Sequence, residues 1–241
     1  MLARFFRYVR CTGYMDLDFG SLVIAAATPS LNDEPAAGAH ADAIEFRIDL
    51  ARSDTDPLDA LNAYEGELPV IATNRIEREG GEAPEGAERL DVLRRAAEFP
   101  RVAAVDIELT TVTNGTGEDL PSHAREHGAK VIVSWHDFEH TPHERLSELL
   151  GRACEYGDVG KVAVTAQDPG DVLELLGVTH QFASGDRPVA TMAMGEVGRH
   201  SRVVAPLYGS RIAYAPVDPE RATAPGQYDL ATLADLIGQL R

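Results

Sequence analysis

The chain has 241 residues, of which 39 are acidic and 22 are basic, so its formal net charge is −17. Binding to nucleic-acid phosphates needs a basic surface, so this balance argues against a nucleic-acid partner. Hydrophobic residues make up 44% of the chain, enough for a sizeable core, and no apolar run approaches the roughly 18 residues that cross a bilayer. Cys11 and Cys154 are too few for a disulfide framework. We therefore expect a cytoplasmic protein with no membrane partner.

Lysine is scarce in this sequence. Twenty of the basic residues are arginine, and only Lys130 and Lys161 are lysine. An acidic, lysine-poor composition is typical of proteins that work in concentrated salt, and a GC-rich genome favours the same composition; both interpretations stay open. Arginine cannot lose its proton to become a nucleophile, whereas a buried lysine can. A lysine in such a sequence therefore indicates a position where arginine could not replace it chemically.

Residues 1–14 differ in character from the rest of the chain. They contain three arginines, four aromatic residues and no acid. A secretory signal would need a longer apolar stretch and a small-residue cleavage site, and neither is present. We interpret residues 1–14 as an extension outside the fold, explained most simply by a start codon assigned upstream, and expect one catalytic domain over residues 15–241.

Eight short apolar runs follow, separated by polar turns and amphipathic stretches. The predicted strands are Leu22–Ala27, Ala43–Leu50, Val70–Arg75, Ala103–Leu109, Val131–His136, Lys161–Thr165, Val189–Met194 and Ile212–Val217. The predicted helices between and after them include Ala87–Phe99, Pro142–Tyr156, Asp168–Leu176 and Asp229–Leu240. Thr141, Pro142 and Glu144 together predict an N-cap, a proline in the first turn and a capping-box glutamate.

Strands that alternate with helices predict a parallel sheet with right-handed crossovers. Eight such units in about 220 residues correspond to a single (β/α)8 TIM barrel of the α/β class. A doubly wound open sheet is the main alternative. That fold usually has a glycine-rich turn after its first strand, whereas Thr28-Pro29-Ser30-Leu31 stands there in this chain.

Lys161 is the first candidate for chemistry. In the sixth predicted strand, alternation places Lys161, Ala163 and Thr165 on one face, and Val162 and Val164 on the other. The valines suit packing against helices, so the lysine should point into the barrel. There, desolvation would favour the neutral, nucleophilic amine. The alternative is a lysine at the solvated bottom of the strand, a role that we expect for Lys130.

His136 ends the fifth predicted strand and is a natural general base, because imidazole titrates near neutral pH. Glu79 or Asp137 could orient it. On its own, such a histidine is more often structural. His140 and His143 extend the spacing to H-x3-H-x2-H, which suggests a metal site. The helix that starts near Pro142 should carry them away from His136, so we expect no metal there.

Arginines follow several strands, which indicates an anionic small molecule, because guanidinium binds carboxylate in a bidentate manner. The candidates are Arg47, Arg75 and Arg202, and each could instead form a structural ion pair with Glu45, Asp106 or Glu108. Gly80-Gly81 predicts a turn. Trp135 and the scattered methionines suit the core, and Cys154 is predicted to be a buried thiol.

Six motifs in chain order resemble the type I 3-dehydroquinate dehydratase family. They cover about residues 20–241, and each is weak alone, but six in order on the predicted strands are specific. The motifs are Glu45-Phe46-Arg47-Ile48-Asp49, Arg75 with Glu79-Gly80-Gly81-Glu82, Ser134-Trp135-His136-Asp137-Phe138, Gly160-Lys161-Val162-Ala163-Val164, Met194-Gly195 through Ser201-Arg202, and Ala224-Pro225-Gly226-Gln227.

The resemblance implies a TIM barrel, often a homodimer, that dehydrates 3-dehydroquinate to 3-dehydroshikimate with no cofactor or metal. It implies that Lys161 forms a Schiff base with the substrate ketone, that His136 is the general acid and base, and that Glu79 pairs with His136. The substrate ligands that it implies are Glu45, Arg47, Arg75, Arg202, Thr223 and Gln227. Thr223 stands where the family usually has serine, which makes that contact less certain, because a β-branched side chain restricts the hydroxyl.

Three alternatives remain at this stage. A class I aldolase or transaldolase barrel also uses a lysine on the sixth strand, but usually acts on phosphorylated substrates, and no clear phosphate cradle follows the last strands. A metal-dependent barrel hydrolase could use His136, Glu108 and Asp106, and EDTA sensitivity would support it. A barrel that binds a carboxylated metabolite without turning it over is the third.

Overall fold

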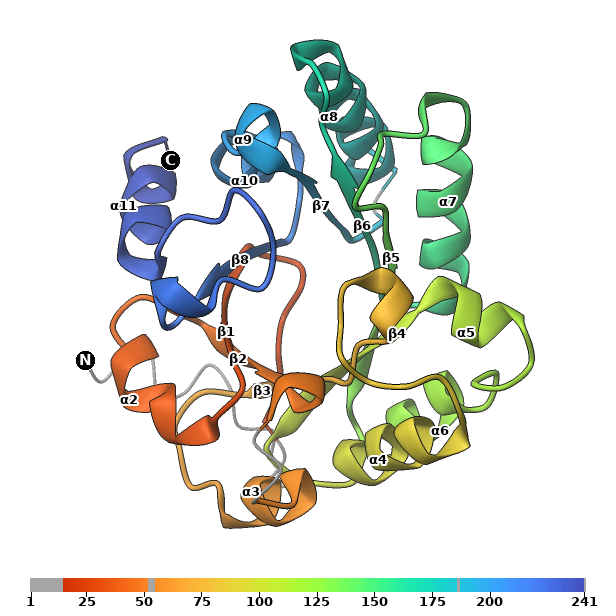
Figure 1. Ribbon diagram of the computed structural model, residues 1–241, viewed down its shortest axis with the longest axis vertical. Coiled ribbons are helices and arrows are strands. Elements are labelled where there is room, and N and C mark those ends of the chain that lie inside the picture. Colours follow the sequence, from red (N-terminus) through yellow and green to blue (C-terminus); the bar gives the residue numbers. More distant parts are fainter. Residues whose placement is uncertain (1–14, 52–54, 186, 241) are drawn as a thin grey trace.

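Eight parallel strands pair in the order β7-β6-β5-β4-β3-β2-β1-β8, and helices surround them (Figure 1). The computed structural model describes residues 15–51, 55–185 and 187–240, so the extension predicted at residues 1–14 lies outside the described residues. The strands are β1 (Val23–Thr28), β2 (Ala43–Arg47), β3 (Val70–Thr73), β4 (Val102–Glu108), β5 (Lys130–His136), β6 (Val159–Thr165), β7 (Val189–Met194) and β8 (Ile212–Pro216). These are the eight predicted strands, in the same order along the chain.

The sheet curls until β7 approaches β8. Arg211 N–H donates to the carbonyl of Val189 over 2.7 Å, and Thr191 N–H donates to Ser210 Oγ over 3.0 Å. These bonds join the two ends of the sheet just before β8 begins. The structure therefore confirms the (β/α)8 barrel over the open doubly wound sheet.

Helices and short 3-10 turns connect the strands. The helices are α2 (Glu34–Ala37), α3 (Pro57–Ala63), α4 (Ala87–Ala97), α5 (Leu109–Thr113), α6 (Leu120–Glu126), α7 (His143–Tyr156), α8 (Pro169–Ala183), α9 (Gly195–Gly198), α10 (Ser201–Val204) and α11 (Leu230–Leu240). The 3-10 turns are η1 (Leu31–Asp33), η2 (Ile48–Leu50), η3 (Glu77–Glu79), η4 (Ala205–Tyr208) and η5 (Pro219–Arg221). Several predicted boundaries were shifted: the second strand ends at Arg47 because η2 follows, the third ends at Thr73, the sixth starts at Val159, and α8 continues seven residues past Leu176.

The predicted cap of α7 was also wrong. Pro142 occupies the N-cap position with no side-chain cap, because the hydroxyl of Thr141 donates to the carbonyl of Thr165 on β6 instead. A full capping box is found on α8, where Asp168 caps the first turn and Asp171 reciprocates. A tertiary hydrogen bond thus displaced the local one that the sequence pattern favoured.

Side-chain alternation sorts each strand into an inner and an outer face. On β6, Val162 and Val164 pack in the cluster under α7 and α8, whereas Ala163 belongs to the cluster inside the barrel. Lys161 shares the inner face with Ala163 and is 4% exposed. The prediction that this lysine points into the barrel is therefore confirmed.

The bottom of the barrel is closed by the segment that precedes β1. Leu17 and Phe19 are buried among the inward residues of the strands. Lys130, the first residue of β5, donates to the carbonyl of Leu17 over 2.6 Å, and its Nζ lies 5.7 Å from the centre of the Phe19 ring. Lys130 thus has the structural role predicted for it.

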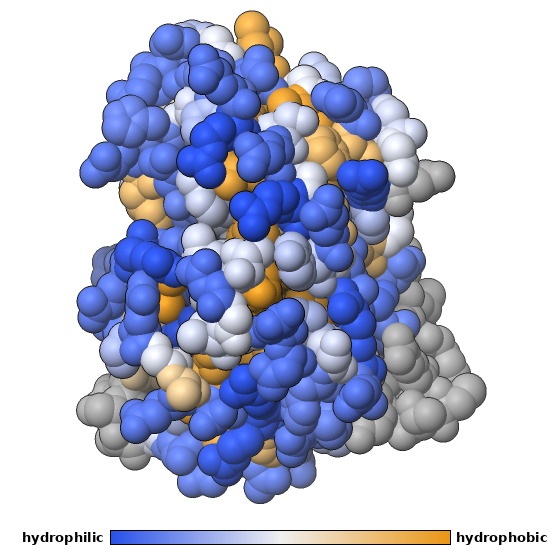
Figure 2. Space-filling model, turned by 90° about the vertical axis from the view of Figure 1, so that its right-hand side faces the viewer, coloured by the Kyte–Doolittle hydropathy of each residue, from blue (hydrophilic) through white to orange (hydrophobic). Residues whose placement is uncertain are grey.

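The outer surface is mostly polar. Figure 2 shows one side of the molecule as largely hydrophilic, with hydrophobic residues confined to small patches. Within the described residues, no helix combines the length and hydrophobicity that crossing a bilayer requires.

Candidate active site

One pocket at the carboxyl ends of the strands contains all nine predicted site residues. Its lining consists of Glu45, Arg47, Thr73, Arg75, Glu79, Gly80, His136, Phe138, Lys161, Ala163, Met192, Met194, Arg202, Tyr214, Thr223, Ala224 and Gln227. Parallel strands all end at the same rim of a barrel, so residues far apart in the sequence meet there.

Lys161 lies at the centre of this pocket. Its Nζ donates to Oδ2 of Asp106 over 2.9 Å, and the same nitrogen lies 4.3 Å from the centre of the Tyr214 ring. Both contacts favour a positive charge on Nζ, one by ion pairing and the other by a cation–π interaction. The site is therefore built to stabilise a buried cation at this position.

The carboxylate of Asp106 accepts hydrogen bonds from three side chains. Arg75 NH2 donates over 2.8 Å, Ser134 Oγ over 2.6 Å, and Lys161 completes the set. Burial alone would raise the pKa of Asp106, but the charges of Arg75 and Lys161 hold it well below its usual range. Asp106 is thus a permanent anion beneath the pocket.

His136 is held by Glu79. Glu79 Oε2 lies 2.9 Å from Nδ1 of His136 and also accepts the backbone N–H of His136 over 3.1 Å. Burial and the nearby cations Arg75 and Lys161 lower the pKa of His136 well below its usual value, so the ring is neutral at pH 7. With Nδ1 donating to Glu79, Nε2 keeps its lone pair and can act as a base. Asp137, the other predicted partner, instead caps the following loop at Glu139 and His140.

Burial raises the pKa of Glu79 to about 7, with a further contribution from the negative charge of Glu108. The nearby Arg75 opposes this shift. Glu79 therefore takes up a proton close to neutral pH.

The turn that carries Glu79 requires its two glycines. Gly80 has φ +79°, in the left-handed region, and a Cβ there would collide with the ring of Phe138. A Cβ on Gly81 would collide with the carbonyl of Arg75. The double glycine is therefore more than a generic turn, because it lets η3 fold tightly enough to place Glu79 beside His136.

Arg75 and Glu108 belong to a buried ion network. Arg75 NH1 donates to Ser134 Oγ over 2.6 Å and to Glu108 Oε1 over 3.2 Å, and Arg89 NH1 lies 3.0 Å from Glu108 Oε2. The structural ion pairs considered for Arg75 are thus present. Asp106 and Glu108, two ligands of the hypothetical metal-dependent hydrolase, are occupied by cationic side chains of the protein.

Glu45 and Arg47 project from β2 into the same pocket. Glu45 accepts the hydroxyl of Thr73 over 3.0 Å, and Arg47 makes a two-pronged ion pair with Asp49, with Nε and NH2 at 2.9 Å and 2.6 Å. Asp49 lies in η2 rather than on the strand, where it fixes the orientation of the guanidinium.

Arg202, on α10, has a different environment. It is 4% exposed, its NH2 donates to the carbonyl of Pro225 over 3.0 Å, and its Nε has no hydrogen-bond partner among the described residues. Burial lowers its pKa to about 10, and no described carboxylate forms an ion pair with it. Such a cation can accommodate an anion from outside the protein.

The last loop is organised by Gln227. Its Oε1 accepts the backbone N–H groups of Thr223 and Ala224 over 2.9 Å and 3.2 Å and lies 3.4 Å from the Thr223 hydroxyl. Gly195 N–H donates to Pro225 over 3.3 Å, so this loop also contacts the start of α9. The amide nitrogen of Gln227 makes no hydrogen bond to the described residues and lines the pocket.

Met192 and Met194 are core residues, as predicted, and they also line the pocket. Phe138 and Tyr214 line it as well and carried no functional prediction. All but Phe138 lie on the inner face of β7 or β8, so strand alternation could have placed them. Cys154, predicted to be buried, is half-exposed, and Trp135 is half-buried against the core.

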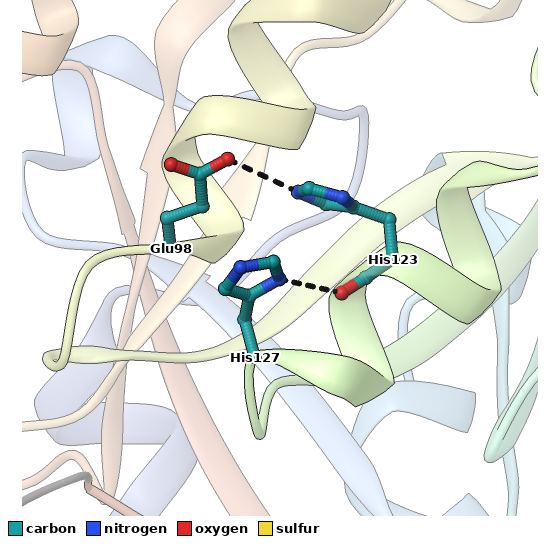
Figure 3. Close-up of side chains that lie close together, drawn as sticks. All are labelled: Glu98, His123 and His127. Carbon is teal, nitrogen blue, oxygen red and sulfur yellow. Dashed lines mark hydrogen bonds and ion pairs between the residues drawn. The ribbon is translucent and has the colours of Figure 1, made fainter.

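One group of potential metal ligands lies away from the pocket, between the ends of α4 and α6 (Figure 3). His123 Nε2 lies 3.3 Å from Glu98 Oε1, and His127 Nδ1 lies 2.9 Å from the carbonyl oxygen of His123. The contact of His123 with Glu98 already joins the two helix ends without an ion, and that of His127 lies within the last turn of α6. His140 and His143 do not converge on His136, as expected: His140 is largely exposed, and His143 hydrogen-bonds Asp171.

Comparison with known proteins decides among the remaining activities. The sequence profile of the type I 3-dehydroquinase family matches residues 21–241. The chain belongs to this family. A 3-dehydroquinate dehydratase of the halophilic archaeon Haloarcula marismortui is 53% identical over 229 residues, which are 93% of this chain and 99% of that protein.

Solved structures agree. The 3-dehydroquinate dehydratase of Geobacillus kaustophilus superposes with a TM-score of 0.81 at 28% identity, covering 91% of each chain. The type I enzyme of Clostridium difficile, solved with covalently modified comenic acid, gives a TM-score of 0.80 at 26% identity and covers 91% of this chain and 92% of its own.

As a type I 3-dehydroquinase, the protein is a lyase that dehydrates 3-dehydroquinate to 3-dehydroshikimate in aromatic biosynthesis. This membership sets aside the aldolase, metal-dependent hydrolase and binding-only alternatives.

Proposed function

We propose that Lys161, His136 and Glu79 perform the dehydration, with Lys161 as the covalent catalyst. The observation that carries this proposal is the position of Lys161. It is a buried amine in the same pocket as a neutral histidine whose Nδ1 is held by a carboxylate. The Clostridium difficile relative was solved with covalently modified comenic acid, which supports covalent chemistry in this family.

The reaction proceeds through an imine. Neutral Lys161 attacks the substrate ketone, and the carbinolamine loses water to give a protonated imine. Nζ of Lys161, which donates to Asp106, must first give up a proton to His136, the base available in the pocket. His136 returns this proton to the carbinolamine hydroxyl as that group leaves as water, so the histidine is neutral again for the next step. The positive imine then withdraws electrons from the neighbouring carbon and acidifies its C–H bond.

His136 removes that proton and returns it to the departing hydroxyl, which leaves as water. Hydrolysis of the imine consumes one water, releases the enone product and restores the lysine. The net change is the loss of one water from 3-dehydroquinate. Asp106 stays anionic throughout and compensates the positive charge first of the ammonium and then of the imine.

The substrate carboxylate is assigned to Arg202, because this buried guanidinium has no carboxylate partner among the described residues. Gln227 and Thr223 lie beside it on the last loop and are proposed to bind neighbouring oxygens. Arg75 is retained as a substrate ligand, although NH1 and NH2 already donate to Asp106, Glu108 and Ser134. Glu45 and Arg47, on β2, are proposed to bind the ring hydroxyls of the substrate.

We further propose that the enzyme is a homodimer in the cytoplasm, as is expected of a biosynthetic enzyme of this family. Light scattering coupled to gel filtration in molar KCl tests the oligomeric state. A mass of two chains is the expected result.

Trapping tests the assignment of Lys161. The protein is incubated with 3-dehydroquinate in molar KCl, reduced with borohydride and digested, and the added mass is mapped. Lys130→Arg is the matched control, because it removes the other lysine of the chain and should leave the adduct in place. Product without an adduct at Lys161 would remove the lysine from the mechanism. No product and no adduct in folded protein would overturn the proposed site as a whole.

A further inference from the structure

Tyr214 lines the pocket and has a buried, unpaired hydroxyl. The residue lies on the inner face of β8 and is 4% exposed, and its Oη has no hydrogen-bond partner among the described residues. A buried hydroxyl without a partner destabilises a folded protein, because it loses its hydrogen bonds to water and gains none in return. Such a group calls for a partner that the described residues do not supply.

A phenylalanine at this position could make every contact that the Tyr214 ring makes. The ring packs in the apolar cluster inside the barrel and lies under Lys161, with Nζ 4.3 Å from its centre. Both contacts use only the aromatic ring. The hydroxyl therefore adds nothing to the folded protein that the described contacts reveal.

Tyr64 provides a comparison within the same chain. It is also buried, and its Oη donates to the carbonyl of Leu68 over 2.9 Å. Tyr64 lies outside the pocket around Lys161. Of these two buried tyrosines, the one with an unsatisfied hydroxyl is the one that lines the active-site pocket.

The charges around Tyr214 define what its hydroxyl can do. Burial, followed by the negative charges of Glu45 and Asp106, raises the pKa of Tyr214 well above its usual value. The hydroxyl therefore stays protonated and can donate. Glu45 already accepts one donor, Thr73, and a carboxylate has further lone pairs to accept another.

We propose that Tyr214 is a further substrate-binding residue, whose Oη donates a hydrogen bond to a ring hydroxyl of bound 3-dehydroquinate. That hydroxyl donates its own proton to Glu45, so an acceptor and a donor of the protein recognise the same group. This inference rests on the proposed active site around Lys161. The carboxylate of the substrate does not compete for Tyr214, because the cationic Arg202 attracts it more strongly.

The test compares Tyr214→Phe with Tyr64→Phe. We expect Tyr214→Phe to raise KM for 3-dehydroquinate about 3- to 10-fold, with kcat changed less than twofold, since a ground-state hydrogen bond is lost. Its thermal midpoint should be equal to that of the wild type or higher, because an unpaired buried hydroxyl is removed. Tyr64→Phe should show the reverse: a lower midpoint with KM and kcat unchanged.

A deoxy analogue of the substrate, lacking the ring hydroxyl, tests the contact itself. The wild type and Tyr214→Phe should bind this analogue equally. Removing the tyrosine hydroxyl then has no further effect once the substrate hydroxyl is gone, which shows that the two groups interact. An unchanged KM for 3-dehydroquinate in Tyr214→Phe would overturn the proposal, whether the midpoint rises or falls. So would an equal loss of affinity for the substrate and for the deoxy analogue.

The trapping experiment distinguishes the role proposed for Tyr214 from the active site proposed around Lys161. Tyr214→Phe should still give the adduct at Lys161 when 3-dehydroquinate is saturating. Absence of the adduct in the wild type would refute the proposed site. An adduct in both proteins with identical KM would refute the role of Tyr214 alone.

Discussion

Nζ of Lys161 and Oδ2 of Asp106 form an ion pair of 2.9 Å in which both side chains are almost completely buried. The partners come from β6 and β4, with β5 between them. Removing water from such a pair is costly, and attraction repays the cost only when further donors satisfy the carboxylate. Ser134 and Arg75 are those donors. The pair therefore depends on a complete network.

Replacing Asp106 with asparagine should be severely destabilising. The buried Lys161 would lose its counterion and Arg75 would lose one of its two, at a cost of about 3–5 kcal/mol in the free energy of unfolding. Urea unfolding in molar KCl measures the loss. Asp119→Asn, which removes an exposed partner of Arg94, should cost about 0–1 kcal/mol. Equal losses in the two variants would contradict the network.

Acid should weaken the same interaction. Because the pKa of Asp106 is lower in the folded protein than in the unfolded chain, its contribution to stability is present at neutral pH. That contribution should fall once the pH drops below about 4, where the unfolded chain takes up the proton. In Asp106→Asn this part of the acid dependence should be missing.

Glu79→Gln should lower kcat at least about tenfold, because a neutral amide stabilises the histidine that accepts a proton less well than a carboxylate does. In the wild type, kcat should fall as the pH drops through about 7, where Glu79 takes up a proton and no longer offers a charged partner to His136. A pH–rate profile of both proteins measures this. In Glu79→Gln this decrease in kcat at low pH should be absent. If the decrease is unchanged in the variant, it arises from the titration of another group.

The raised pKa of Glu79 also affects folding. A carboxyl group that holds its proton more tightly in the folded state favours folding at low pH, and this contribution is lost as the pH rises from about 4.3 to about 7. Glu79→Gln should therefore gain stability relative to the wild type as the pH rises over this range. Parallel unfolding curves at pH 5 and pH 8 test the sign.

Arg202→Gln should raise KM for 3-dehydroquinate about 10- to 100-fold, the effect of losing a charged hydrogen bond. Its stability should not fall, because the guanidinium is buried without a described carboxylate partner. The control is Arg199→Gln, which removes a half-exposed guanidinium stacked on Tyr228. It should leave KM unchanged. A comparable rise in KM in both variants would point to disruption of the loop instead.

The net charge of −17 predicts that salt stabilises the fold. Raising the ionic strength from 0.1 to 1 M shortens the screening length from about 10 to about 3 Å, which weakens repulsion among surface carboxylates. The thermal midpoint should therefore rise steadily with KCl. A midpoint that does not change between 0.1 and 3 M would leave the acidic composition to be explained by codon usage.

Treatment with EDTA should leave activity unchanged, because Asp106 and Glu108 pair with protein cations and the proposed chemistry uses an amine. Loss of activity that Zn²⁺ restores would contradict the imine mechanism. His123→Ala is a useful second variant, because it removes a ligand from the group of Glu98, His123 and His127 without touching the pocket.

Strand alternation accounts for most of what the sequence predicted correctly. Lys161 points inward because its neighbours Val162 and Val164 need the helix-covered face, and strand ends converge because the sheet is parallel. All nine site residues therefore met in one pocket. For the residues on β2, β5 and β6 this assembly follows from a two-residue period and from the direction of the strands. Arg202, Thr223 and Gln227 follow the last strands, and the family resemblance indicated them.

Specific pairings could not be predicted in the same way. Which carboxylate faces Lys161 depends on the register of β4, β5 and β6, which no local pattern encodes. The hydroxyl of Thr141 bonds to Thr165 instead of capping α7 for the same reason. Met192 and Met194 show a second limit, since apolar side chains that line a pocket have the same sequence signature as those in a core.

The two lysines of this chain both lie along the barrel, Lys130 at the bottom and Lys161 beneath the mouth. Lys161 is almost completely buried, and the partly exposed amine of Lys130 donates to the carbonyl of Leu17, so neither amine is freely available to reagents. Each lysine becomes a natural reporter of opening at one end of the barrel. Acylation of Lys130 would follow fluctuations of the segment at Leu17, and acylation of Lys161 would follow access to the pocket. The dynamics of the two ends could thus be followed separately, without introducing any label.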